Sequence, residues 1–176
     1  MIYLIDGASS SGKTYLSQKM LEKLHIPYFS VDHLKMSFYR NGQLCTIMDD
    51  QTVTDFLFPY LKEMLLTIMA NNQHIIIEGC YFQSEDWVTF IKKYEQQVKY
   101  CCIVFSNDYI NYATIVEHRN VIESRLYEEE RTLEELITEH EQKRAFCTEN
   151  NLPMLEIKKD FLTEIQNWIA NEQLNK

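Results

Sequence analysis

Five short apolar runs recur along the chain, and longer segments with helical spacing of apolar residues separate them. The runs span residues 2–5, 28–31, 74–77, 98–105 and 154–157. Runs of this length are typical of buried strands, and their alternation with helix-length segments predicts a parallel sheet with helices on both faces. We therefore expect an α/β protein with three layers, α/β/α.

The clearest helical pattern lies between Asp49 and Asn72, where apolar residues fall three or four positions apart over many turns. It predicts one long amphipathic helix, in which Pro59 could introduce a kink. Another helix is expected to begin at Thr132, because the Thr-Leu-Glu-Glu run there matches a capping box. The charged segment before it, residues 117–131, is a candidate lid between two helices.

A glycine-rich loop follows the first predicted strand, with the pattern Gly7-x-x-x-x-Gly12-Lys13-Thr14. Glycines permit backbone angles that turn successive N–H groups toward a phosphate, and Lys13 adds a compact positive charge. The next helix points its positive end at the anion, and the Thr14 hydroxyl suits Mg²⁺. The alternative is an ordinary glycine turn with a surface lysine. The residues predicted to bind a nucleotide are Gly7, Ala8, Ser9, Ser10, Ser11, Gly12, Lys13, Thr14 and Tyr15.

Length, charge and cysteine usage narrow the class of protein. With 176 residues, 45% of them hydrophobic, we expect one core and a single domain over residues 1–176. A net charge of -9 argues against a nucleic-acid or membrane-surface binder, because those use broad basic faces. The five cysteines form no C-x-x-C pair, and no apolar run has membrane-spanning length. We expect reduced core thiols and a cytoplasmic location.

The glycine-rich loop, Gly-Ala-Ser-Ser-Ser-Gly-Lys-Thr, resembles the Walker A motif of P-loop NTPases. The layout of the whole chain resembles the nucleoside-monophosphate-kinase-like branch, which includes adenylate, shikimate and gluconate kinases, chloramphenicol phosphotransferases and zeta-toxin kinases. The resemblance implies a five-stranded parallel sheet of order 2-3-1-4-5, an acceptor-binding helical region after the second strand, and a basic lid. It also implies ATP with Mg²⁺ as the phosphoryl donor.

The lid arginines that the resemblance implies would neutralise charge on the transferred group and exclude water. Arg119 and Arg125 are the first candidates for this catalytic role, ahead of Arg131. Surface pairing with neighbouring glutamates is the alternative for each of them.

Asp32 ends the second predicted strand, at the edge where open parallel sheets bind ligands. Phosphoryl transfer to a hydroxyl needs a carboxylate that orients the acceptor and takes its proton, which makes Asp32 a candidate catalytic residue beside Lys13. The alternative is that Asp32 only caps a helix beginning at His33. Lys35 and Arg40 follow on the same predicted helix. They are candidates for binding the acceptor, or else solvated helix charges.

Glu78 and Gly79 follow the third predicted strand, at the same edge of the sheet. An acidic residue there resembles a Walker B carboxylate, which holds magnesium directly or through water, or else contacts the acceptor. A structural role for Glu78 is the alternative. The next residues are Cys80, Tyr81 and Phe82, which either line the acceptor pocket or pack in the core. The Asp-Gly-Phe-Pro-Arg run of adenylate kinases is absent here, which disfavours AMP as acceptor.

The sequence thus favours a kinase that transfers the terminal phosphoryl group of Mg-ATP to a small-molecule hydroxyl or phosphate. One alternative is a regulatory or partner-binding protein that uses nucleotide occupancy as a switch with little transfer. Another is a toxin-like kinase acting on a sugar nucleotide.

Overall fold

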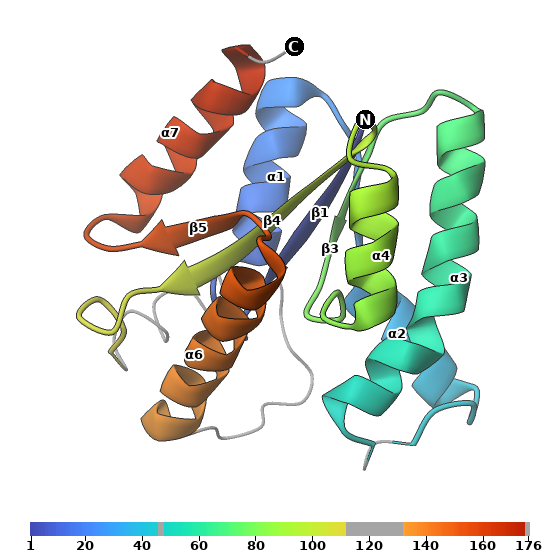
Figure 1. Ribbon diagram of the computed structural model, residues 1–176, viewed down its shortest axis with the longest axis horizontal. Coiled ribbons are helices and arrows are strands. Elements are labelled where there is room, and N and C mark those ends of the chain that lie inside the picture. The colour runs from blue at the N-terminus through green and yellow to red at the C-terminus, as the bar shows by residue number, and fades with distance from the viewer. Residues whose placement is uncertain (46–47, 112–131, 175–176) are drawn as a thin grey trace.

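One parallel sheet of five strands organises the molecule (Figure 1). The computed structural model describes residues 1–45, 48–111 and 132–174. The strands are β1 (Ile2–Gly7), β2 (Tyr28–Ser30), β3 (Ile75–Glu78), β4 (Val98–Phe105) and β5 (Met154–Ile157). Their order is β2-β3-β1-β4-β5, and every neighbouring pair is parallel. The predicted α/β class and the strand order 2-3-1-4-5 are both confirmed.

Helices connect the strands over the described ranges: α1 (Lys13–Leu24), α2 (Val31–Arg40), α3 (Asp50–Ala70), α4 (Glu85–Lys93), α6 (Leu133–Asn150) and α7 (Phe161–Leu174). The long helix predicted from residue 49 is α3, which contains Pro59 and is capped by the Asp49 carboxylate. The capping box at Thr132 is also confirmed, since Thr132 and Glu135 bond each other's backbone N–H groups. No separate motif or spacing in the sequence predicted α4 or α7.

The two faces of the sheet bury separate apolar clusters, because side chains alternate along each strand. Ile2 and Leu4 of β1 face α3 and α4, whereas Tyr3 and Ile5 face α1 and α7. Figure 1 shows these helix pairs on opposite sides of the sheet. Parallel strands place their carboxyl ends at one edge, so the segments that follow β1, β2 and β3 meet there.

The described residues also bear on the cysteines and on membrane-spanning helices. All five cysteines are free thiols, as predicted, and Cys101, Cys102 and Cys147 are buried, whereas Cys80 is partly buried and Cys45 is exposed. Across residues 1–45, 48–111 and 132–174, every helix is too short or too polar to cross a bilayer.

The packing of α3 against the sheet makes a direct stability prediction. Leu57 is fully buried in the cluster under α3, so Leu57→Ala should lower the free energy of unfolding by about 2–5 kcal/mol. Leu162→Ala on α7 serves as the control, because Leu162 is 48% exposed, and should change it by less than about 0.5 kcal/mol. Urea unfolding of the two variants checks this. Equal effects would contradict the assigned core.

Candidate active site

The loop between β1 and α1 needs glycine at both of its ends. A side chain at Gly7 would place its Cβ 2.5 Å from the Ile103 carbonyl oxygen. At Gly12, where φ is +89°, a Cβ would lie 2.3 Å from the ring of Phe161. Real Cβ atoms essentially never come this close to another atom, so either the backbone near Ile103 or the Phe161 ring would have to shift. The positive φ at Gly12 adds strain for any other residue. The loop geometry therefore explains the two glycines of the motif.

Lys13 turns back across this loop. Its Nζ donates to the carbonyl oxygens of Gly7 (3.2 Å) and Ala8 (2.8 Å), and the residue is only 6% exposed. Burial alone would lower the pKa of Lys13, but the neighbouring Cys80, Glu78 and Glu139 more than offset it and raise the pKa. Lys13 is therefore a fixed positive charge at the loop.

A buried carboxylate holds the start of the loop. Asp6 is completely buried and accepts hydrogen bonds from the Gly7 N–H (2.7 Å), the Tyr100 hydroxyl (2.7 Å) and the Lys143 ammonium (3.0 Å). Lys143 also donates to the carbonyl oxygen of Cys80 (2.8 Å). Burial alone would lower the pKa of Lys143, but Asp6, Cys80 and Cys102 together outweigh burial and raise the pKa. The network ties β1, β4, α6 and the end of β3 together.

Asp32 lies in a cluster of polar side chains after β2 and β3. Its Oδ1 accepts a hydrogen bond from the Tyr81 hydroxyl (3.2 Å) and forms an ion pair with the Lys35 ammonium (3.1 Å). Lys35 also donates to the Tyr81 hydroxyl and lies 5.0 Å from the centre of its ring. Tyr81 is nearly buried, and burial followed by the Asp32 charge raises its pKa. These contacts fix the Asp32 carboxylate, whose side chain stays 38% exposed.

The helix after β2 begins two residues before His33, where a helix capped by Asp32 would begin. α2 begins at Val31 with Ser30 as its N-cap residue, so Asp32 lies in the first turn rather than before the helix. The interpretation of Asp32 as a cap of a helix beginning at His33 is therefore wrong. Arg40 is exposed at the other end of α2, eight residues from Asp32, and the structure does not bring it into the cluster.

Glu78 and Gly79 lie beside the loop at the end of β3. Glu78 is 2% exposed, pairs in register with Ile5 of β1, and is close enough to raise the pKa of Lys13. A Cβ on Gly79 would lie 2.9 Å from the Cβ of Val31, so close packing of β3 on α2 explains this glycine. The structure thus brings Glu78 to Lys13, and it gives Gly79 a steric role.

The predicted lid lies outside the described residues. This applies to Arg119, Arg125 and Arg131 and to the boundaries 117–131. Their catalytic roles stay predictions.

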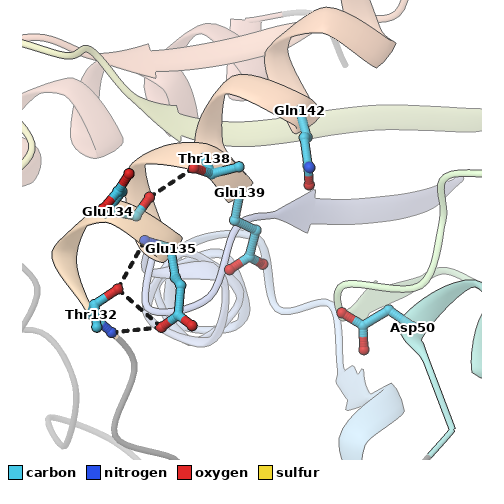
Figure 2. Close-up of a pocket in the computed structure, with 7 residues that line it drawn as sticks. All are labelled: Asp50, Thr132, Glu134, Glu135, Thr138, Glu139 and Gln142. Carbon is cyan, nitrogen blue, oxygen red and sulfur yellow. Dashed lines mark hydrogen bonds between the residues drawn. The ribbon is translucent and has the colours of Figure 1, made fainter.

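Glu139 of α6 reaches the loop that the sequence analysis assigned to phosphate. Its Oε1 accepts hydrogen bonds from the backbone N–H of Ser9 (2.8 Å) and from the Ser9 hydroxyl (3.2 Å). Glu139 also lines a cavity of about 520 Å³ between α6 and the start of α3. The cavity is lined by Asp50, Thr132, Glu134, Glu135, Thr138, Glu139 and Gln142. Figure 2 shows Glu135 and Glu139 pointing from α6 into this opening and Asp50 on its far side.

Sequence reasoning missed three side chains of this edge. Asp6 could have been found, because a carboxylate at the end of an apolar run must find a partner when it is buried. Lys143 and Glu139 gave no such signal, since both lie in a charged helical run that is typical of solvated surface. Only the folded chain shows that this face of α6 covers the loop.

His140, next to Glu139, is fully buried and stacks on Phe105. Its Nδ1 accepts the Phe105 N–H at 2.9 Å, so the neutral ring carries its proton on Nε2. Burial, together with the nearby Lys13 and Arg144 charges, lowers the pKa of His140 to about 3. The imidazole is therefore neutral in the folded protein at physiological pH.

Comparison with solved structures gives the fold a name. The chain resembles shikimate kinase from Aquifex aeolicus with a TM-score of 0.60 and 17% identity, over 99% of this chain and 98% of that one. It resembles deoxyadenosine kinase from M. mycoides (0.57, 17%, 100% of both chains) and a gluconokinase from Sinorhizobium meliloti (0.53, 12%, 99% and 96%). The chain has the fold of these small-molecule kinases. No protein-family model and no curated protein sequence matches it.

In this fold the buried pair under the loop makes a stability prediction. Asp6→Asn leaves the Lys143 ammonium buried without its counter-charge, which should cost about 3–5 kcal/mol of unfolding free energy. The double variant Asp6→Asn/Lys143→Met removes both charges and should cost less than the sum of Asp6→Asn and Lys143→Met alone. Urea unfolding of the single and double variants measures the coupling. Additive effects would contradict a direct pair.

His140 predicts loss of stability in acid. The unfolded chain binds a proton at His140 near pH 6.5, whereas the folded chain does so only near pH 3. The contribution of His140 to the free energy of unfolding is therefore complete above pH 6.5. It falls as the pH drops and is smaller by about 2 kcal/mol at pH 5. His140→Gln should flatten the dependence of urea unfolding on pH between 7 and 5. His25→Asn, at an exposed histidine, should leave it unchanged.

Proposed function

We propose that this protein is a Mg-ATP-dependent phosphotransferase that phosphorylates a small-molecule hydroxyl. The observation that carries the proposal is the meeting of two groups at one sheet edge. One is the glycine loop with Lys13 folded across it, and the other is the Asp32 carboxylate fixed by Lys35 and Tyr81. The kinase fold supports the same reading. In this proposal residues 1–176 act as a single domain.

The donor site uses the loop amides from Ala8 to Thr14 and the Lys13 ammonium. The backbone N–H groups and the N-terminus of α1 would bind the phosphates, and Lys13 would neutralise their charge. Tyr15 follows in the first turn of α1 and packs on Phe161, whose ring also closes against Gly12. This side of the loop is therefore apolar and suits a nucleoside better than a second phosphate.

Asp32 would act on the acceptor. As the acceptor oxygen bonds to the terminal phosphorus, the bond to the leaving ADP oxygen breaks and the hydroxyl proton passes to the Asp32 carboxylate. Lys35 and Tyr81 both contact Oδ1 of that carboxylate, and these contacts fix its position. A carboxylate that is already in position loses less conformational entropy on the way to the transition state, which lowers the barrier.

Magnesium fits the donor atoms at this edge. Thr14 offers a hydroxyl and Glu78 a nearly buried carboxylate, and hard oxygen atoms of this kind are the ligands that Mg²⁺ prefers. Within the described ranges, His, Cys, Asp and Glu form no cluster of three that could hold a metal. One or two protein ligands are what Mg²⁺ uses when it arrives with phosphates. When bound, it would supply charge neutralisation of the transferred phosphoryl group.

The lining of the cavity beside the loop does not include Asp32, but an acceptor that extends from Asp32 into this cavity should lack a phosphate group. Its lining includes the carboxylates of Asp50, Glu134, Glu135 and Glu139 and, among the described residues, no lysine or arginine. These charges would repel a phosphorylated acceptor, whereas they accept hydrogen bonds from hydroxyl or amino groups. A polyhydroxylated or amine-bearing acceptor is the class that we propose.

The test is ADP formation from Mg-ATP with pairs of compounds, each hydroxylated metabolite or nucleoside beside its phosphorylated form. We expect one unphosphorylated acceptor to stimulate turnover, and Asp32→Asn to lower kcat by about 10²–10⁴-fold. Lys13→Met should abolish nucleotide binding. The matched controls are Asp55→Asn on α3 and Lys23→Met on α1, both at exposed positions.

Three results would count against this proposal. Preference for the phosphorylated member of a pair would overturn the acceptor class. Full activity of Asp32→Asn would overturn its role as the base. Tight nucleotide binding without any acceptor-stimulated turnover would favour a nucleotide switch instead.

A further inference from the structure

Glu139 accepts a hydrogen bond from a backbone N–H that the glycine loop is proposed to offer to a nucleotide phosphate. Its carboxylate accepts the Ser9 N–H at 2.8 Å, a distance typical of a charge-assisted hydrogen bond, and also the Ser9 hydroxyl. Ser9 lies inside the glycine loop, two residues after Gly7. The side chain of a distant helix therefore occupies one backbone donor of the phosphate loop.

A phosphate oxygen and this carboxylate cannot both accept the Ser9 N–H. They also carry like charges, and close approach of like charges is costly in a partly buried site. Phosphate binding at Ser9 therefore requires Glu139 to leave. The structure offers it a destination, because Glu139 also lines the cavity beside α6 (Figure 2). A change of its side-chain rotamer, further into that cavity and away from Ser9, would free the amide without displacing α6.

Lys143, one turn further along α6, explains why the helix itself would stay in place. Its ammonium is anchored to Asp6 and to the Cys80 carbonyl oxygen, and its side chain is 9% exposed. Lys143 and Glu139 therefore have different roles on this face of α6. Lys143 fixes α6 to the sheet, and Glu139 contacts the loop from the fixed helix.

From these contacts we infer that Glu139 is an internal competitor of the nucleotide phosphates, an autoinhibitory contact that lowers the affinity of the loop for its donor. The inference rests on the proposed function, since it needs phosphate to bind at the loop. It goes beyond that function because neither the proposed donor site nor the proton transfer to Asp32 uses Glu139. The consequence is that removing the Glu139 charge strengthens nucleotide binding, whereas removing a binding residue weakens it.

The experiment is calorimetric titration of the full-length protein with Mg-ATP. Glu139→Gln and Glu139→Ala should each bind Mg-ATP about 5- to 100-fold more tightly than the wild type, the size typical of coupling between two sites. The alanine variant should gain at least as much, because glutamine can still accept the Ser9 N–H. Glu141→Gln is the matched control. Glu141 is exposed on the same helix, bonds Asn107, and should leave the affinity unchanged.

A second probe locates the competition at the phosphates. Inorganic tripolyphosphate should gain affinity in both Glu139 variants, whereas adenosine, which has no phosphate, should not. Thermal unfolding without ligand shows whether each variant is folded. A purely structural role of Glu139 predicts weaker binding of Mg-ATP in the variants.

The outcomes separate this inference from the proposed function. Unchanged or weaker Mg-ATP binding in folded Glu139→Gln and Glu139→Ala, with measurable binding by the wild type, would overturn the inference alone. No binding of Mg-ATP or tripolyphosphate by any of the proteins would overturn the proposed function and the inference together. Binding by the Glu139 variants and not by the wild type would support both.

Discussion

The ion pair between Asp6 and Lys143 is the constraint on which the rest of the candidate site depends. A fully buried carboxylate is tolerable only when its oxygens are satisfied, and here the Gly7 N–H, Tyr100 and Lys143 satisfy them. The same contacts fix the first residue of the glycine loop and dock α6 on the sheet. Lys143 extends the network to the end of β3 through the Cys80 carbonyl oxygen. One buried charge therefore sets the positions of the loop, of α6 and of the segment that carries Tyr81.

The part of the site that the sequence predicted is the part that local rules determine. Gly7 and Gly12 are required because Ile103 and Phe161 leave no room for a Cβ, and this requirement is visible as a motif. The strand order also followed from a resemblance in layout, and the carboxyl-edge rule then placed Asp32 and Glu78 near the loop. Each of these inferences needs only short stretches of sequence or a known topology.

What the sequence did not predict depends on contacts between distant residues. Asp6 and Lys143 are 137 positions apart, and nothing in the charged run around Lys143 distinguishes it from solvated helix. Glu139 is hidden in the same way. Asp32 was placed at the correct edge, but the helix start at Val31 was missed because the strand is only three residues long. Tyr81 was left between pocket and core, and the structure shows that its ring is buried while its hydroxyl bonds Asp32.

The helix α6 brings one positive and one negative side chain to the glycine loop. It brings a lysine to the carboxylate beneath the loop and a glutamate to an amide of the loop itself, within little more than one turn. Lys143 therefore fixes the start of the loop through Asp6, and Glu139 occupies the Ser9 N–H of the same loop. This arrangement links the occupancy of the loop to the cavity that Glu139 also lines.

The central claim is that the backbone from Ala8 to Thr14 binds the phosphates of a nucleotide. Hydrogen exchange of its amides, measured with and without Mg-ATP and read by mass spectrometry, tests this most directly. The account predicts that Mg-ATP slows exchange in the peptide covering the glycine loop and the start of α1, and that Lys13→Met removes this protection. Unchanged exchange in that peptide at saturating Mg-ATP would contradict the claim.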